Sequence, residues 1–189
     1  MNRTRRKQSK YGPKSAKSLW AYAKRLNEDR AKKISAAIVE FASQNSVDAI
    51  VMEHLDFKGC KKRGSKAQRL SMWNHGIIRE KVEQKAHLLG IRIATICAWK
   101  TSALAFDGSG SVTRDNDNHA LATFMTGKQY NCDLSASYNI GARYFIRELL
   151  KSLPATEESR VKAKVPDAGR RTSCTLSTLR VLVKELSAA

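Results

Sequence analysis

Paired cysteines, long apolar runs and phosphate-loop signatures are all missing from this 189-residue sequence. The four cysteines are 37, 35 and 42 residues apart and form no C-x-x-C pair. This spacing predicts neither a zinc ribbon nor a disulfide framework, so we expect ordinary thiols in a reducing compartment. No apolar stretch reaches the length of about 18 residues that a transmembrane helix needs. We therefore predict a cytoplasmic protein without a membrane partner.

Acidic residues are also few: 17 of them face 35 lysines and arginines, which gives a formal net charge of +18. This excess is larger than solubility requires. A polyanion is the expected partner, and its affinity should fall steeply with salt because each neutralised phosphate releases counterions.

The positive charge lies in two blocks, at residues 1–33 and 58–69. For the first ten residues a solvated or disordered arm is an equally good interpretation. Elsewhere the blocks flank one apolar strand, which favours a binding role. The residues we expect to contact nucleic acid are Lys24, Arg25, Lys32, Lys33, Lys58, Lys61, Lys62, Arg63, Lys66 and Arg69.

The first half of the chain alternates between helical and strand patterns. Apolar residues at helical spacing predict a helix over 15–43 and another over 66–90 that stops at Gly90. The β-branched runs at 47–53 and 91–99 predict two buried strands. Strands separated by a crossover helix pair in parallel, so the predicted fold class is α/β. The apolar residues expected to face the core are Leu19, Tyr22, Leu26, Ile34, Ile38 and Phe41 in the first helix, and Leu70, Trp73, Ile77, Ile78, Val82 and Leu88 in the second.

The second half begins with a turn-rich insertion at about 101–132, which can hold a short strand or two. A helix is predicted over 133–153, with Leu134, Tyr138, Phe145 and Leu149 on its apolar side. Residues 155–173 are polar and are expected to be loose, before a last short helix at 175–186. Only two good strands are predicted in all, which is few for a buried parallel sheet, and this indicates that strands are missing before residue 1.

Two acidic residues stand out by position. Glu53 closes the first predicted strand, and Asp133 opens the helix that follows the insertion. Ends of strands and starts of helices line the crevice of open α/β sheets, so the two carboxylates could converge on Mg²⁺ or Mn²⁺. The alternatives are that Asp133 is only a helix cap and that Glu53 only faces solvent.

Several segments together resemble the C-terminal part of the TnpB (OrfB) family of insertion-sequence proteins. They are "VDAIVMEHLDFKG", "WNHGIIREKVEQKAHLLGIRIATI", Thr-Ser at 101–102 and "YNCDLSASYNIGARYFIREL". Members of this family have a RuvC-like nuclease domain of the RNase H fold and are related to type V CRISPR effectors. The accessory, TnpB-related branch is the most similar.

The resemblance implies roles for the two acids. Glu53 matches the second catalytic acid of the family, and Asp133 matches the third. It also implies Mg²⁺, a DNA target and a guide RNA. No zinc is expected, because Ala, Leu and Phe occupy positions of the insertion where many relatives have the cysteines of a zinc ribbon.

One departure is the first catalytic acid, an aspartate on a strand that would precede this chain. We therefore expect the C-terminal portion of a RuvC-like domain, which an N-terminal fragment could complete. The predicted parts are a basic connector at 1–14, the partial nuclease domain at 15–153 and a basic tail at 154–189. The open edge of strand 47–53 predicts poor stability or association with another chain.

The first functional hypothesis is a fragment of a transposon-encoded, RNA-guided DNA endonuclease. Glu53→Gln or Asp133→Asn should then abolish cleavage but preserve binding. The isolated chain is expected to be inactive, because two acids rarely fix both metals of an in-line site. The alternative is a catalytically inactive DNA- or RNA-binding accessory protein, which depends on charge alone; a basic structural protein without a specific site is a third interpretation.

Overall fold

The computed structural model describes residues 2–55, 74–170 and 172–188, which fall into two compact units. The first unit contains the described residues up to 50 and those from 74 to 93. The second contains 51–55 and the described residues from 94 onwards. No helix within these described ranges is both long and apolar enough to cross a membrane.

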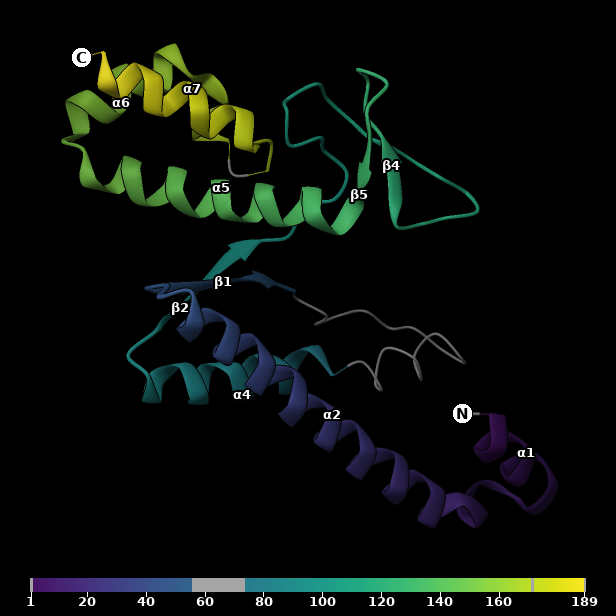
Figure 1. Cartoon of the computed structure of the whole chain (residues 1–189). Coiled ribbons are helices and arrows are strands. Elements are labelled where there is room, and N and C mark those ends of the chain that lie inside the picture. Colours follow the sequence, from purple (N-terminus) through teal and green to yellow (C-terminus); the bar gives the residue numbers. More distant parts are fainter. Residues whose placement is uncertain (1, 56–73, 171, 189) are drawn as a thin grey trace. The chain divides into compact units, whose positions relative to one another are not determined.

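The first unit consists mainly of helices (Figure 1). α1 spans Asn2–Tyr11, the 3₁₀ helix η1 spans Pro13–Ala16, and α2 spans Lys17–Gln44. α4 spans His75–Leu88 and packs along α2. Residues 1–14, expected to be a connector, therefore hold a helix, and Gly12 at φ 85° makes the turn that ends it.

The buried face of α2 differs from the prediction. Small side chains lie on the buried side, at the helical spacing of Ala31, Ser35, Val39 and Ala42. The large residues that we expected to face the core are mostly exposed, and Phe41 keeps 67% of its surface accessible. Those exposed large residues are Tyr22, Leu26, Ile34 and Phe41. Small side chains allow two helix backbones to approach closely. The face of α2 that carries them is therefore the one that is packed and buried.

α4 agrees with the prediction in part, because the predicted core residue Val82 is buried. Val82 and Ala86 are buried, whereas Ile77 and Leu88 are exposed. Of the other predicted core residues of this helix, Leu70 and Trp73 lie outside the described residues. α4 ends at Leu88. Gly90, at φ 69°, then turns the chain into the next strand, as predicted.

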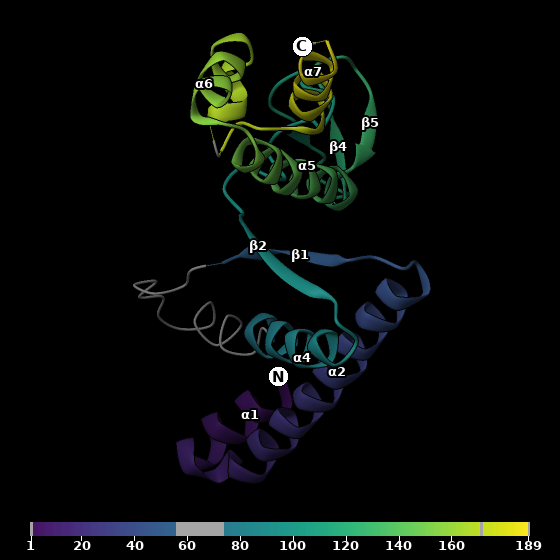
Figure 2. The ribbon, with the colours of Figure 1, turned by 90° about the vertical axis from the view of Figure 1, so that its left-hand side faces the viewer.

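Strands β1 (Ala49–His54) and β2 (Arg92–Cys97) form a two-stranded sheet. Both arrows run in the same direction in Figures 1 and 2, as a crossover connection through α4 requires. Both strands lie within one or two residues of the predicted runs. The predicted α/β class is therefore confirmed.

The turn-rich insertion folds into a small antiparallel sheet of its own. It contains β3 (Thr113–Arg114), β4 (Leu121–Thr123) and β5 (Gln129–Asn131), paired in that order. Aromatic rings pack edge to face beside it: Phe106 lies 5.5 Å from Phe124, 5.0 Å from Tyr130 and 5.2 Å from Tyr138. This cluster is the hydrophobic centre of the insertion, and through Tyr138 it joins the insertion to the following helix.

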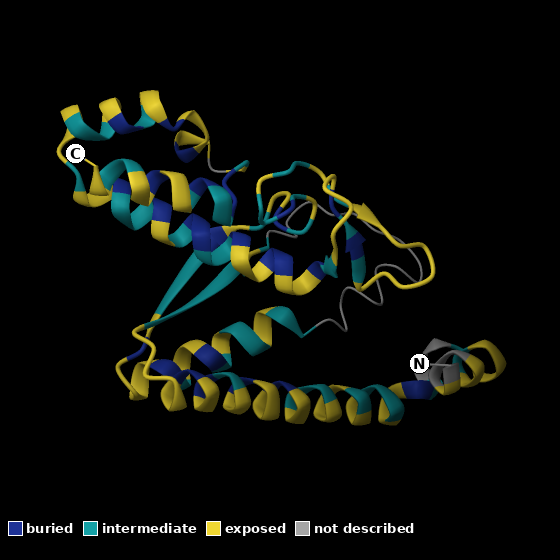
Figure 3. Cartoon of the chain, turned by 45° about the horizontal axis from the view of Figure 1, so that its top comes forward, coloured by how far each residue is buried: buried dark blue, intermediate teal, exposed yellow. Residues whose placement is uncertain are grey.

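That helix, α5, spans Cys132–Ser152 and is coloured by burial in Figure 3. Of the four residues predicted on its buried side, only Leu149 packs against the core. Leu134, Tyr138 and Phe145 are exposed, and the buried residues are Cys132, Ser135, Ala136, Asn139, Ala142, Arg143, Ile146 and Leu150. A polar and partly charged face is therefore turned inwards, which needs partners for its buried donors.

The segment 155–173, which was expected to be loose, is mostly helical in its described part, and the last short helix predicted at 175–186 is confirmed at Leu176–Ser187. α6 (Ala155–Lys164), η2 (Pro166–Gly169) and α7 (Leu176–Ser187) pack together and against α5. Their core contains Ile146 and Leu150 of α5 together with Val161, Val165 and Leu182. The sequence prediction missed this core because α6 carries only one buried residue, so its apolar stripe is too thin to recognise.

Candidate active site

Glu53 lies at the end of β1, as predicted, and its carboxylate is held by a threonine. The hydroxyl of Thr101 donates to Glu53 Oε1 at 2.7 Å. Thr101 keeps only 1% of its surface accessible, whereas Glu53 is half-buried. Only one carboxylate oxygen takes part in this hydrogen bond, so the second oxygen can bind another group.

Asn139 fixes Thr101 in turn. Its side-chain amide donates to Thr101 O at 3.0 Å and to Leu104 O at 2.9 Å. Its Oδ1 accepts the backbone N–H of Leu176 at 3.3 Å. One fully buried side chain of α5 therefore ties together the loop after β2 and the start of α7. The orientation of Glu53 thus depends on α5 through Asn139 and Thr101.

Arg143 lies one turn further along α5 and keeps only 4% of its surface accessible. Its guanidinium donates to four backbone carbonyls, those of Cys97, Trp99, Thr172 and Cys174, at 2.8 to 3.2 Å. Burial lowers the pKa of Arg143 below its ordinary value, because desolvation disfavours the charged form. The carboxylate of Glu53 opposes that shift. Arg143 thus places a buried positive charge close enough to Glu53 for the two groups to interact electrostatically.

Asp133 is exposed in the first turn of α5 and does not cap the helix. The cap is Asn131, whose Oδ1 accepts the N–H groups of Asp133 at 2.9 Å and Leu134 at 3.0 Å. Capping, one alternative for Asp133, is therefore wrong. The Asp133 side chain makes no hydrogen bond or ion pair with any other described residue, and a carboxylate in the first turn is favoured by the helix dipole.

Glu53 and Asp133 belong to the same compact unit. Among the described residues, no group of three or more His, Cys, Asp or Glu side chains is arranged to hold a metal ion. Mg²⁺ commonly uses only one or two carboxylates and completes its shell with water and substrate phosphates. Two acids with available oxygens fit that requirement, and their convergence on one ion stays a prediction.

The predicted nucleic-acid contacts are described only in part. Lys24, Arg25, Lys32 and Lys33 all lie exposed on α2. Arg25 and Lys32 are seven residues apart and so share one side of the helix. Lys24 and Lys33 form exposed ion pairs with Glu28 and Asp29. The second basic block, Lys58, Lys61, Lys62, Arg63, Lys66 and Arg69, lies outside the described residues.

Sequence reasoning overlooked the buried polar residues that position Glu53. Thr101, Asn139 and Arg143 all lie within the segments that resemble TnpB proteins, but the sequence analysis predicts no site role for them. A signal was available: Asn139 and Arg143 are four residues apart, on the helix face that also carries Ala136 and Ile146. Polar residues at core spacing indicate a buried hydrogen-bond network.

Comparison with known proteins supports the fold alone. No protein-family model matches the chain, and no curated protein is significantly similar to it. The described part of the chain is a mixed α/β arrangement with two small sheets. A similar arrangement occurs in Cas12f1, in the cryo-EM structure of its complex with sgRNA and target DNA. The TM-score is 0.50 at 20% sequence identity, and the match covers 72% of this chain but only 38% of Cas12f1.

Proposed function

We propose that this chain is a nucleic-acid-binding module of an RNA-guided DNA nuclease of the TnpB and Cas12 type. In this module Glu53 and Asp133 supply two ligands of a Mg²⁺ site. The observation that carries the proposal is the carboxylate of Glu53, held at the end of β1 by the buried hydroxyl of Thr101. The similarity in fold to Cas12f1, a protein bound to guide RNA and target DNA, supports it.

The roles of the side chains follow from their contacts. Thr101 and Asn139 orient Glu53, and Asn131 leaves the carboxylate of Asp133 available by capping α5 in its place. Bound Mg²⁺ would activate a water molecule and stabilise the leaving oxygen during phosphodiester cleavage. A further carboxylate, from an N-terminal fragment or partner, would complete the active site.

Transposon origin and a guide RNA belong to the same proposal. Both come from the resemblance to TnpB proteins, and the net charge of +18 is consistent with two nucleic-acid partners. The excess of positive charge alone would also serve the alternative, a catalytically inactive DNA- or RNA-binding protein. That alternative is favoured by the lack of any three-ligand cluster among the described residues.

The two functions differ in how Mg²⁺ affects binding to DNA. At constant ionic strength, Mg²⁺ should tighten binding of a labelled DNA strand by about tenfold, roughly 1.4 kcal/mol, if carboxylates and phosphates share the ion. Glu53→Gln and Asp133→Asn should each lose this effect. Glu80→Gln and Asp117→Asn are controls, because they remove exposed acids elsewhere. Fluorescence anisotropy gives the affinities.

The binding-only alternative predicts a different result. Mg²⁺ would then compete with the protein for phosphates and weaken binding equally in all five proteins. That outcome would contradict the metal site. Cleavage of DNA by the wild-type chain, lost in both acid variants, would show in addition that the module is active alone.

A further inference from the structure

A cavity of about 450 Å³ lies in the second unit, between β2, α5, α6 and η2. Its volume is within the usual range for small-ligand sites. Part of the lining is apolar and buried, formed by Ile96, Ile146 and Leu150. An apolar wall of this kind can pack against the ring of a sugar or a base.

The remaining lining is mostly cationic. Four cations line the cavity, Arg143, Arg147, Lys151 and Lys162, and Glu158 is the one acidic residue among the described residues of the lining. Arg143 already uses four of its five N–H groups on backbone carbonyls and so contributes mainly its charge. The cavity therefore combines an apolar wall with a net positive charge, the two properties that bind a nucleotide.

Three of these cations retain donors for a ligand. Arg147 donates through Nε to Glu148 at 2.8 Å and through Nη1 to Thr95 O at 3.0 Å, which accounts for two of its five N–H groups. Lys151 has an ion pair of 3.7 Å with Glu148, and Lys162 pairs with Glu158. An ammonium group carries three N–H donors, so a phosphate could replace or join these carboxylates.

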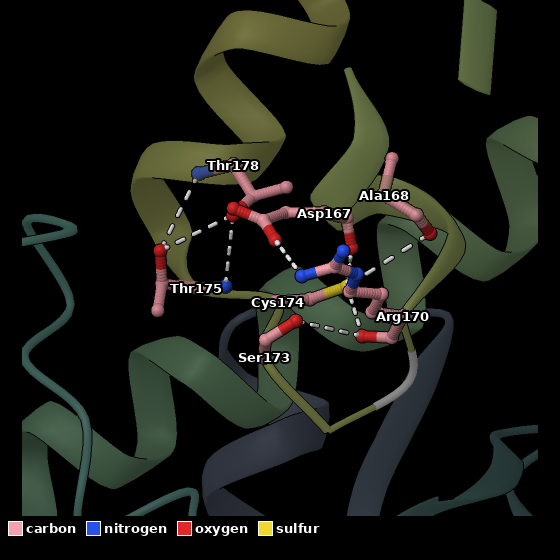
Figure 4. A network of polar contacts seen from close by, with 7 residues as sticks. All are labelled: Asp167, Ala168, Arg170, Ser173, Cys174, Thr175 and Thr178. Carbon is pink, nitrogen blue, oxygen red and sulfur yellow. Dashed lines mark hydrogen bonds and ion pairs between the residues drawn. The ribbon is translucent and has the colours of Figure 1, made fainter. Parts of the chain in front are cut away.

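The wall of the cavity that contains Cys174 is held in place by its own hydrogen bonds (Figure 4). The single S–H donor of Cys174 lies within reach of two carbonyl oxygens, Asp167 O at 3.0 Å and Arg170 O at 3.1 Å. Next to it, Thr175 and Thr178 form a capping box that starts α7. Burial raises the pKa of the Cys174 thiol, in keeping with a structural role.

We infer that this cavity binds one nucleotide unit, with its phosphate against Arg147, Lys151 and Lys162 and its sugar or base against the apolar wall. In the proposed function, on which this inference rests, the unit belongs to a nucleic-acid strand. A free nucleotide carries the same phosphate chemistry and is the other possible source.

The test compares two double variants of the full chain that lose the same charge. Arg147→Gln/Lys151→Gln removes two cations of the cavity, and Arg180→Gln/Lys184→Gln removes two exposed cations of α7. The probes are a labelled single-stranded 12-mer, a nucleoside 5′-monophosphate and inorganic phosphate, in buffer without Mg²⁺. Circular dichroism checks that both variants are folded.

The cavity variant should bind the 12-mer about tenfold more weakly than the control variant. Its plot of log affinity against log salt should also be shallower by about 1.4, the value for two lost phosphate contacts on a single strand. Glu158→Gln should bind more tightly than wild type, by about twofold to fivefold, because it removes the acid beside the phosphate.

The probes separate the two sources. If the cavity variant loses affinity only for the monophosphate, the ligand is a free nucleotide; if it loses affinity for the 12-mer, the ligand is a strand. Equal affinities and salt slopes of the two double variants for every probe would overturn the inference. Because Mg²⁺ is absent, that failure would leave the result on Glu53 and Asp133 unaffected.

Discussion

Asn139 shows how one buried amide can organise a site made of distant segments. It donates to the carbonyls of Thr101 and Leu104 and accepts from the N–H of Leu176. An amide has both donors and an acceptor, and no other uncharged side chain of this size offers the same set. The position therefore tolerates little change.

We predict that Asn139→Asp lowers the free energy of unfolding by about 2 kcal/mol, because a carboxylate would face two carbonyl oxygens without a donor. This loss of unfolding free energy should depend on pH. The pKa of the new carboxyl would be raised in the folded state, so the protonated form favours folding. The variant should therefore be closest to wild type in stability at low pH, and the loss should grow as the pH rises. Urea unfolding at several pH values measures this.

Asn118→Asp is the control. Asn118 is exposed, and its Oδ1 accepts from Ala120 N, which a carboxylate can also do. Its unfolding free energy should stay within about 0.5 kcal/mol of wild type. A loss of similar size in both variants would contradict the buried role of Asn139.

At the scale of elements, the start of α5 decides what Asp133 can do. Asn131 caps the helix, so the carboxylate two residues later is not needed for that purpose. Both side chains are of a type that caps helices, and the structure uses Asn131.

Asn131→Ala should therefore destabilise the protein by about 1 kcal/mol and lower its melting temperature by about 2 to 4 °C. Asn131→Ser keeps a capping oxygen and should remain close to wild type. Thermal unfolding followed by circular dichroism gives both values. If Asp133→Asn lowered the melting temperature as much as Asn131→Ala, Asp133 would share the capping role.

Sequence patterns predicted the positions of the helices and strands more accurately than they predicted which side of each is buried. The runs at 47–53 and 91–99 and the helices at 15–43 and 133–153 were recognised from local periodicity. The buried sides of α2 and α5 were missed, since small and polar residues pack there. Which side is covered depends on distant segments, such as α4 and α7, which local patterns do not encode.

The prediction of the candidate site also combines residues that local sequence indicates with contacts that it does not. Position at a strand end and a helix start identified Glu53 and Asp133, and the resemblance to TnpB proteins suggested their roles. The hydrogen bonds from Thr101 and Asn139 could not be predicted, because their partners are 48 and 38 residues away in sequence. Only the folded chain brings these groups together.

At the scale of the whole molecule, large apolar side chains remain exposed on several elements. Phe41 of α2, Leu88 of α4 and Phe145 of α5 are all more than half accessible. The β1–β2 sheet has only two strands among the described residues. These exposed apolar side chains are available for contact with the further fragment or partner that the proposed function requires.

The central claim is that Glu53 and Asp133 hold one divalent ion. The most direct measurement is Mn²⁺ binding, followed by electron paramagnetic resonance in the presence of a single-stranded oligonucleotide, because Mn²⁺ occupies the oxygen-ligand sites of Mg²⁺. We expect one bound ion in wild type and an affinity for Mn²⁺ about tenfold lower, a difference of roughly 1.4 kcal/mol, in both Glu53→Gln and Asp133→Asn. Equal Mn²⁺ binding by wild type and the two variants would contradict it.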